Sequence, residues 1–194
     1  ELGQMQSKHG HGEGSSLALH GETLVVNWDH EGPSFLLALN KRTGKQLWRA
    51  ARDEHSSWST PLIVIHKNKP QVIVSARKLR SYDLATGQLN WECAGLSHNV
   101  VASPVAVDSV VYAGCSYDKR SMIAVALEGA AGDLTGTAHV LWSLNRHTPY
   151  VPSPLLYFGK LYFLKHYQGV LSCVEAKTGK SVYGPMRLPD IFNV

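Results

Sequence analysis

The stretch LNKRTGKQLW at residues 39–48 decides the fold, because it returns along the chain. It recurs as YDLATGQLNW at residues 82–91 and as VEAKTGKSVY at residues 174–183. A degenerate copy runs from Leu127 to Trp142. Self-similarity at a fixed period of about 20 to 50 residues is the signature of a repeat architecture. The chain therefore consists of repeated structural units.

The turn glycines of the four copies are Gly44, Gly87, Gly136 and Gly179, which gives spacings of 43, 49 and 43 residues. A second marker keeps the same register: a Ser or Thr followed by Pro, directly before an apolar run. It stands at residues 59–62, 102–105 and 152–155, with residues 14–17 in its place in the first repeat. Two independent markers with one period predict units the size of a propeller blade.

Short apolar runs rich in β-branched and aromatic residues fill each unit, and turn residues separate them. The runs lie at residues 24–26, 62–65, 71–74, 110–112 and 160–164. Such runs predict strands, since they are too short for core helices. We expect an all-β fold, a β-propeller of four antiparallel four-stranded blades, at about residues 14–50, 55–93, 98–145 and 149–185.

Each repeat pairs a turn glycine with a large aromatic residue. The tight turn needs one residue with positive φ, which glycine adopts without steric strain. The aromatic side chain is expected to pack between neighbouring blades, because one blade alone cannot bury both of its faces. The predicted structural residues are Gly44, Trp48, Gly87, Trp91, Gly136, Trp142, Gly179 and Tyr183.

Composition narrows the function classes. The 194 residues are 44% hydrophobic and 18% charged, which is typical of a globular protein. Their net charge of +4 comes from scattered Lys and Arg, so we expect no nucleic-acid partner. No apolar run is long enough to span a membrane as a helix. The cysteines, Cys93, Cys115 and Cys173, form no CxxC motif.

The repeated Asp-x-x-Thr-Gly-x-x-x-Trp pattern, complete at residues 83–91, resembles the tryptophan-docking motif of the quinoprotein-like β-propellers. That family includes dehydrogenases that use pyrroloquinoline quinone (PQQ), and non-catalytic scaffolds similar to the lipoprotein BamB. The resemblance implies a periplasmic or exported parent protein. A fold alone does not choose between these functions.

The dehydrogenase branch of this family implies an adjacent Cys-Cys disulfide, carboxylate and amide ligands for calcium, and eight blades around a quinone. This chain has no adjacent cysteines, and four blades provide half of such a ring. We therefore predict no cofactor and no catalytic residue. The alternative, a fragment of a PQQ-dependent alcohol or sugar dehydrogenase, would bring PQQ and calcium with it.

Residues 191–194 read as the entry to a further blade. Three arrangements stay open: part of a larger, for example eight-bladed, ring; a closed four-bladed propeller; or two chains that complete one ring by self-association through their open edges.

Histidines raise the question of a metal site, above all His9 and His11 beside Gly10. No third and fourth ligand follows at the spacing of a zinc site, and no calcium-loop motif is present. We predict no metal.

Loops at one end of a propeller usually carry its recognition residues. Several polar and aromatic residues precede the second marker or follow the first strands, so they recur at one height of the structure. We predict that they form a rim that binds a protein partner: Trp28, Asp29, His30, Glu31, His55, Trp58, His98, Asn99, His147 and Tyr150. A carbohydrate-binding or sensor domain of an exported protein is the second alternative, and loops that only connect blades are the competing interpretation.

Overall fold

The computed structural model describes residues 2–165 and 169–189, which form four β-sheets after a short 3₁₀ turn, η1 (Lys8–Gly10). The first sheet contains β1 (Ala18–His20), β2 (Thr23–Trp28), β3 (Phe35–Asn40) and β4 (Gln46–Ala51). The second contains β5 (Leu62–His66), β6 (Lys69–Ser75), β7 (Lys78–Asp83) and β8 (Leu89–Ala94). The third contains β9 (Val105–Val107), β10 (Val110–Cys115), β11 (Ser121–Ala126) and β13 (Val140–Leu144). The fourth contains β14 (Leu155–Tyr157), β15 (Lys160–Lys165), β16 (Val170–Glu175) and β17 (Ser181–Arg187).

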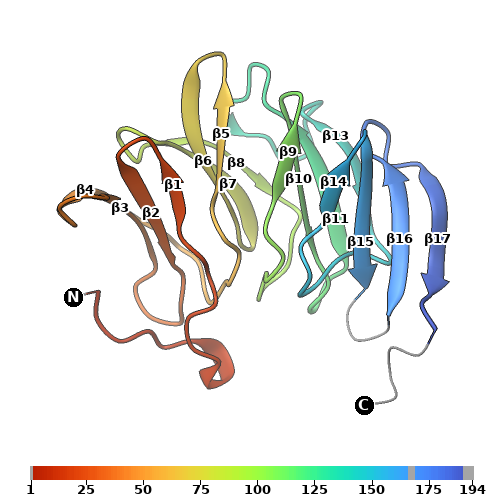
Figure 1. Ribbon diagram of the computed structural model, residues 1–194, viewed down its shortest axis with the longest axis horizontal. Helices are drawn as coiled ribbons and strands as arrows, with labels where there is room; N and C mark the ends of the chain where they lie inside the picture. Colours follow the sequence, from red (N-terminus) through yellow and green to blue (C-terminus); the bar gives the residue numbers. More distant parts are fainter. Residues whose placement is uncertain (1, 166–168, 190–194) are drawn as a thin grey trace.

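The four sheets lie side by side in chain order, and the N-terminal segment runs past one end of the first sheet (Figure 1). The four strands named for each sheet form an antiparallel meander and pair in chain order. No α-helix occurs among the described residues. The predicted all-β class with four antiparallel sheets is therefore confirmed. Residues 191–194, which we expected to enter a further blade, lie outside the part that the structure describes.

The third repeat departs from the others through its insertion. Residues Gly132–Asp133 form β12, which pairs in parallel with β8 and gives the second sheet a short fifth strand. Leu134 from the same insertion is 2% exposed and belongs to the core between the second and third sheets. The insertion thus extends one blade onto its neighbour.

The turn between the last two strands of a sheet is built as the repeat predicts. The carboxylate of Asp83 accepts hydrogen bonds from the backbone N–H groups of Ala85 and Thr86, at 3.0 and 2.8 Å, and from the Thr86 hydroxyl at 2.9 Å. Gly87 follows with φ +74°. The side chain of Asn40 accepts the corresponding bonds in the first sheet, so one turn geometry repeats.

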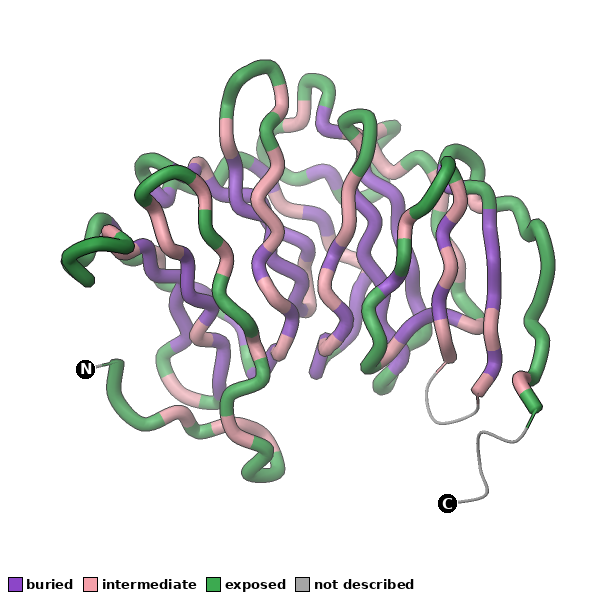
Figure 2. The backbone as a smooth tube through the Cα atoms, in the orientation of Figure 1, coloured by how far each residue is buried: buried purple, intermediate pink, exposed green. Residues whose placement is uncertain are grey.

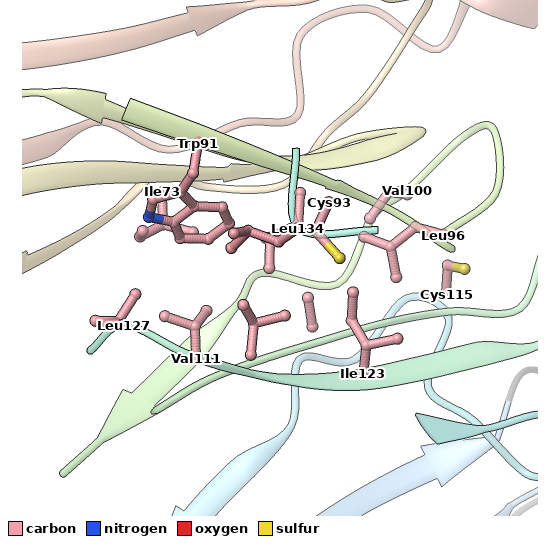
Figure 3. Packing of buried hydrophobic residues seen from close by; sticks show 13 residues of the cluster. Ile73, Trp91, Cys93, Leu96, Val100, Val111, Cys115, Ile123, Leu127 and Leu134 are labelled. Carbon is pink, nitrogen blue, oxygen red and sulfur yellow. The ribbon is translucent and has the colours of Figure 1, made fainter. Parts of the chain in front are cut away.

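Apolar side chains fill the spaces between neighbouring sheets. Figure 2 shows the buried stretches of the strands in purple. Between the second and third sheets, Trp91 and Ile73 face Val111 and Leu127 (Figure 3). A second core joins the first two sheets around Trp48, and a third joins the last two around Phe163. The sheets are held together by burial of both faces, as in stacked repeats.

The segments that lead into the sheets are bonded to one another. The backbone N–H of Trp58 donates to the carbonyl of Val100 at 2.8 Å, and the N–H of Ala102 donates to the carbonyl of Tyr150 at 3.0 Å. Each entry segment therefore lies directly beside the next. This arrangement brings residues from three repeats to one end of the molecule.

Candidate functional site

Two of the predicted rim residues are buried and serve the interior. Asp29 follows β2, and its carboxylate accepts two hydrogen bonds from Arg52, at 2.7 and 3.0 Å, and one from the Ser57 hydroxyl at 2.7 Å. The side chains of Asp29 and Arg52 are both 0% exposed. Burial alone lowers the pKa of Arg52, but the charges of Asp29, Tyr82 and Glu54, together with the hydrogen bonds to Asp29, outweigh burial and raise that pKa. The pair is a buried salt bridge at the first interface.

His30 is also buried. Its Nδ1 atom accepts a hydrogen bond from the backbone N–H of Gln6 at 3.1 Å, and its Nε2 atom lies 3.2 Å from the Pro33 carbonyl. The imidazole therefore fixes the N-terminal segment to the loop after β2. Trp28 stacks on Phe35, with ring centroids 6.1 Å apart, on the face of the first sheet that packs Val26 and Leu37. None of these side chains lines the aromatic pocket that is described below.

A second buried cluster centres on Arg80. Its guanidinium donates to Glu54 at 2.8 Å and to Glu92 at 2.9 Å, and it pairs with Asp53 at 2.5 Å. Burial raises the pKa of Glu54, although the charges of Arg52 and Arg80 lower it in part. The network joins adjacent strands of the second sheet to the loop after β4.

Three other predicted residues meet in an open aromatic pocket of about 290 Å³. The residues that line it, called the aromatic pocket below, are His9, His11, Trp58, Asn99, Val101, Tyr117, Tyr150 and Val151. They come from the N-terminal segment, three entry segments and the β10–β11 turn. The hydrogen bonds between entry segments hold Trp58, Asn99 and Tyr150 on one surface.

The walls of the aromatic pocket are fixed by specific contacts. The indole N–H of Trp58 donates to the Gly12 carbonyl at 2.9 Å, and the His11 ring lies 6.1 Å from the Trp58 ring. Tyr117 stacks on Tyr150 with centroids 6.0 Å apart, and Tyr117 is 43% exposed. The pocket thus presents aromatic faces to solvent.

Asn99 gives the aromatic pocket a polar atom. The residue is 4% exposed and has φ +53°, a conformation that asparagine tolerates better than most residues. Its Oδ1 atom is buried and has no hydrogen-bond partner within residues 2–165 and 169–189. An unmatched buried acceptor is unfavourable unless a ligand or water supplies a donor. The atom is suited to receive a hydrogen bond from a bound group.

A histidine cluster continues the same surface. The ring of His55 pairs with Glu31 at 3.2 Å and lies 6.4 Å from the ring of His98, which is 2.9 Å from Asp118. Burial alone raises the pKa of Asp118, yet the hydrogen bonds from His98 and Ser97 lower it overall. The cluster is an exposed polar flank of the aromatic pocket.

His147, the last predicted rim residue, lines a different pocket between the third and fourth sheets. Sequence reasoning missed Tyr117, which stands in a strand turn rather than before the second marker. Strand topology could have identified Tyr117, because the β10–β11 turn and the entry segments lie at the same end of a meander. His9 and His11 were weighed only as metal ligands.

The predicted structural residues are distributed unevenly between the interfaces. Trp48 and Trp142 donate their indole N–H groups to the carbonyls of Leu84 and Ala176 in the next sheet, at 2.9 and 2.8 Å. Their rings lie against Gly87 and Gly179 respectively. Trp91 instead donates to Gln71 of its own sheet, under the insertion. Gly44 and Gly136 face open space, and Tyr183 is 40% exposed on β17.

Within residues 2–165 and 169–189, no group of three or more His, Cys, Asp or Glu side chains is placed to hold a metal ion. The described chain also has no helix with the length and apolar character needed to span a bilayer.

Solved structures share this fold. BamB from Moraxella catarrhalis is 19% identical with a TM-score of 0.62, over 89% of this chain and 49% of that one. Quinohemoprotein alcohol dehydrogenase from Comamonas testosteroni is 14% identical with a TM-score of 0.67, over 94% of this chain and 35% of that one. The computationally designed Ika4 protein is 15% identical with a TM-score of 0.59, over 90% and 97% of the two chains. These matches confirm the predicted β-propeller fold with four antiparallel sheets.

Sequence comparisons agree. ER membrane protein complex subunit 1 from Xenopus laevis is 30% identical over 112 residues, which are 57% of this chain and 10% of that protein. The chain thus spans only a small part of this relative. The family model described as outer membrane protein assembly factor BamB matches residues 1–189. The chain therefore belongs to the BamB-like family of PQQ-type β-propeller repeats.

Proposed function

We propose that this chain is a non-catalytic propeller segment that binds a protein partner through the aromatic pocket. The observation that carries the proposal is the meeting of Trp58, Tyr117 and Tyr150 in one pocket that the buried residue Asn99 also lines. Tryptophan and tyrosine dominate the energetics of protein interfaces, because they bury large apolar surfaces and still offer a polar group.

A peptide segment fits this pocket chemically. An apolar or aromatic side chain would stack on the tyrosine pair, while a backbone or side-chain N–H donates to Asn99. The histidine cluster supplies a polar rim beside that anchor. By their names, two relatives are an assembly factor and a subunit of a complex, and partner binding by this chain is consistent with both.

The test is a selection of peptides from a random displayed library against the folded chain, followed by fluorescence titration of the selected peptides. We expect Tyr117→Ala and Tyr150→Ala to weaken binding by about tenfold or more each. Trp58→Ala is the stronger change, and circular dichroism checks that it folds. Tyr157→Ala is the matched control, since Tyr157 is 59% exposed at the end of β14 and does not line the aromatic pocket.

A selection that yields no peptide, or peptides that bind all three pocket variants as tightly as the parent chain, would contradict the proposal. A parallel titration with PQQ and calcium addresses the dehydrogenase alternative. Saturable quinone binding with dye-linked alcohol oxidation would replace the scaffold function by an enzymatic one.

A further inference from the structure

The pocket that contains His147 lies at the third interface, between sheets three and four, and has a volume of about 300 Å³. Its polar side chains come from the fourth sheet and from the loop between the two sheets. The residues that line it are Leu144, Arg146, His147, Phe163, Ser172, Val174, Gly179, Ser181, Gly184 and Pro185. None of them is acidic, so the pocket contains cationic and neutral donors without a counter-charge of its own.

Two buried polar atoms of this pocket have no hydrogen-bond partner among the described residues. Ser172 is 6% exposed, and its Oγ atom makes no hydrogen bond. The Nδ1 atom of His147 is buried and equally unmatched. Leaving such atoms unsatisfied is unfavourable, so their presence in one cavity indicates a place for a ligand's polar group.

The electrostatic surroundings are positive. Burial lowers the pKa of His147, and the charges of Lys165, Arg146 and Arg120 lower it further. The imidazole is therefore surrounded by cations and is neutral near pH 7. A group placed between Arg146 and the two unmatched atoms meets a field that favours an anion.

The first interface shows which residues occupy the equivalent place in another repeat. Arg146 stands four residues after Trp142, as Arg52 stands four residues after Trp48. At the first interface Arg52 binds the carboxylate of Asp29. The register of the first hairpins aligns Asp29 with Ser116, because Thr23 and Val110 occupy the same pairing position. Arg146 thus stands at the sequence position of the buried Arg52 but is exposed where it lines the pocket, and Ser116 stands at the position of Asp29.

The fourth sheet, which faces this pocket, also has smaller and uncharged residues where the second sheet has large ones. Counting back from Gly87 and Gly179 aligns Arg80 with Ser172 and Tyr82 with Val174. At the first interface the large side chains of Arg80 and Tyr82 are in place, and Tyr82 is 3% exposed. At the third interface two smaller residues line a cavity instead. The substitutions remove side-chain volume and internal charge at the same place.

We propose that this pocket binds a carboxylate from outside the chain, of the kind carried by an aspartate or glutamate side chain of a partner. Arg146 forms the ion pair, and the Ser172 hydroxyl donates a hydrogen bond to the same group. Charge-assisted bonds of this type are stronger and shorter than neutral ones. The site is separate from the aromatic pocket and does not depend on it.

The test is a titration of the isotope-labelled chain with glutarate, followed by amide and arginine side-chain NMR signals, with glutaramide at matched ionic strength as the neutral comparison. We expect saturable shifts at Ser172, Gly184 and Arg146 with glutarate only. Arg146→Met should weaken the binding about tenfold, the loss of one charge-assisted bond. Ser172→Ala should weaken it less.

Arg42→Met is the matched control, because Arg42 is exposed and pairs with Glu22 at a turn of the first sheet. It should leave the glutarate titration unchanged, as should Tyr150→Ala, which separates this site from the aromatic pocket. Equal shifts with glutaramide, or unaltered glutarate binding by Arg146→Met, would overturn the proposal. Tighter binding of inorganic phosphate than of glutarate at the same signals would overturn the assignment to carboxylates.

Discussion

The indole ring of Trp48 lies directly against Gly87 of the next sheet. A Cβ atom built on Gly87 would come within 2.5 Å of the Trp48 ring, whereas one built on Gly44, at the same turn position of the first sheet, would meet nothing within 4 Å. Both glycines have positive φ, +74° and +69°. The two positions therefore separate the strain of the turn from the contact with the ring.

We predict that Gly87→Ala destabilises the fold more than Gly44→Ala. The Gly44 variant carries only the conformational strain of alanine at positive φ, about 1 to 2 kcal/mol. The Gly87 variant adds displacement of a packed ring, about 1 to 3 kcal/mol more. Urea unfolding of the two variants measures the difference. Equal losses of stability would mean that the Trp48 contact contributes nothing at this interface.

Removal of one partner of the buried pair Asp29 and Arg52 should be strongly destabilising. Arg52→Met leaves the Asp29 carboxylate buried without its counter-charge, which costs about 3 to 5 kcal/mol. The exposed pair of Glu22 and Arg42 is the comparison, and Arg42→Met should change the unfolding midpoint very little. A mild effect of Arg52→Met would show that water reaches the pair.

Acid should weaken the fold partly through Glu92. The hydrogen bond from Lys78, together with that from Arg80, lowers the pKa of Glu92 below its ordinary value of 4.5, although burial opposes this. The stabilisation is therefore present above that value and is lost as the pH falls through the lower pKa of the folded state. We predict a flatter decline of stability for Glu92→Gln than for the parent chain between about pH 6 and pH 3, measured by urea unfolding. Parallel curves would contradict this role.

The cysteines should be unreactive in the folded chain. Cys93, Cys115 and Cys173 are free and 0% exposed. Burial, with a smaller effect of Asp133, raises the pKa of Cys93 to about 11, so little thiolate exists at neutral pH. Ellman's reagent should label no thiol in buffer and all of them in guanidinium chloride. Rapid labelling of the native chain would reveal local opening of these sheets.

The sequence predicted the sheets well because the repeat encodes them locally. Glycine turns, apolar runs and the Ser/Thr-Pro marker each determine the backbone conformation over a few residues. Together they set where each strand begins and ends. The pairing of β12 with β8 was not predictable, since Gly132–Asp133 has no alternation and finds its partner 41 residues away.

The candidate site was predictable in part. Trp58, Asn99 and Tyr150 stand three, five and four residues before Pro61, Pro104 and Pro154 of the second marker, so the repeat brings them to the same end of the molecule. Asp29 and His30 looked exposed because ionisable residues usually are. Their burial depends on Arg52 and Gln6, which are distant from them in sequence.

The three interfaces between sheets differ in chemistry. The first contains a buried charged network, and the second has an apolar core with an exposed ion pair of Lys67 and Glu128 at its edge. At the third, Arg146 lines a pocket whose lining residues include no carboxylate. Blades of one architecture are therefore not interchangeable modules. If the second repeat were moved to follow the third, Arg80 would face Arg146 with no carboxylate at the position of Asp29. The side chains at each interface therefore fit only one order of the repeats. Recombination that changes this order would be selected against even where every blade folds correctly.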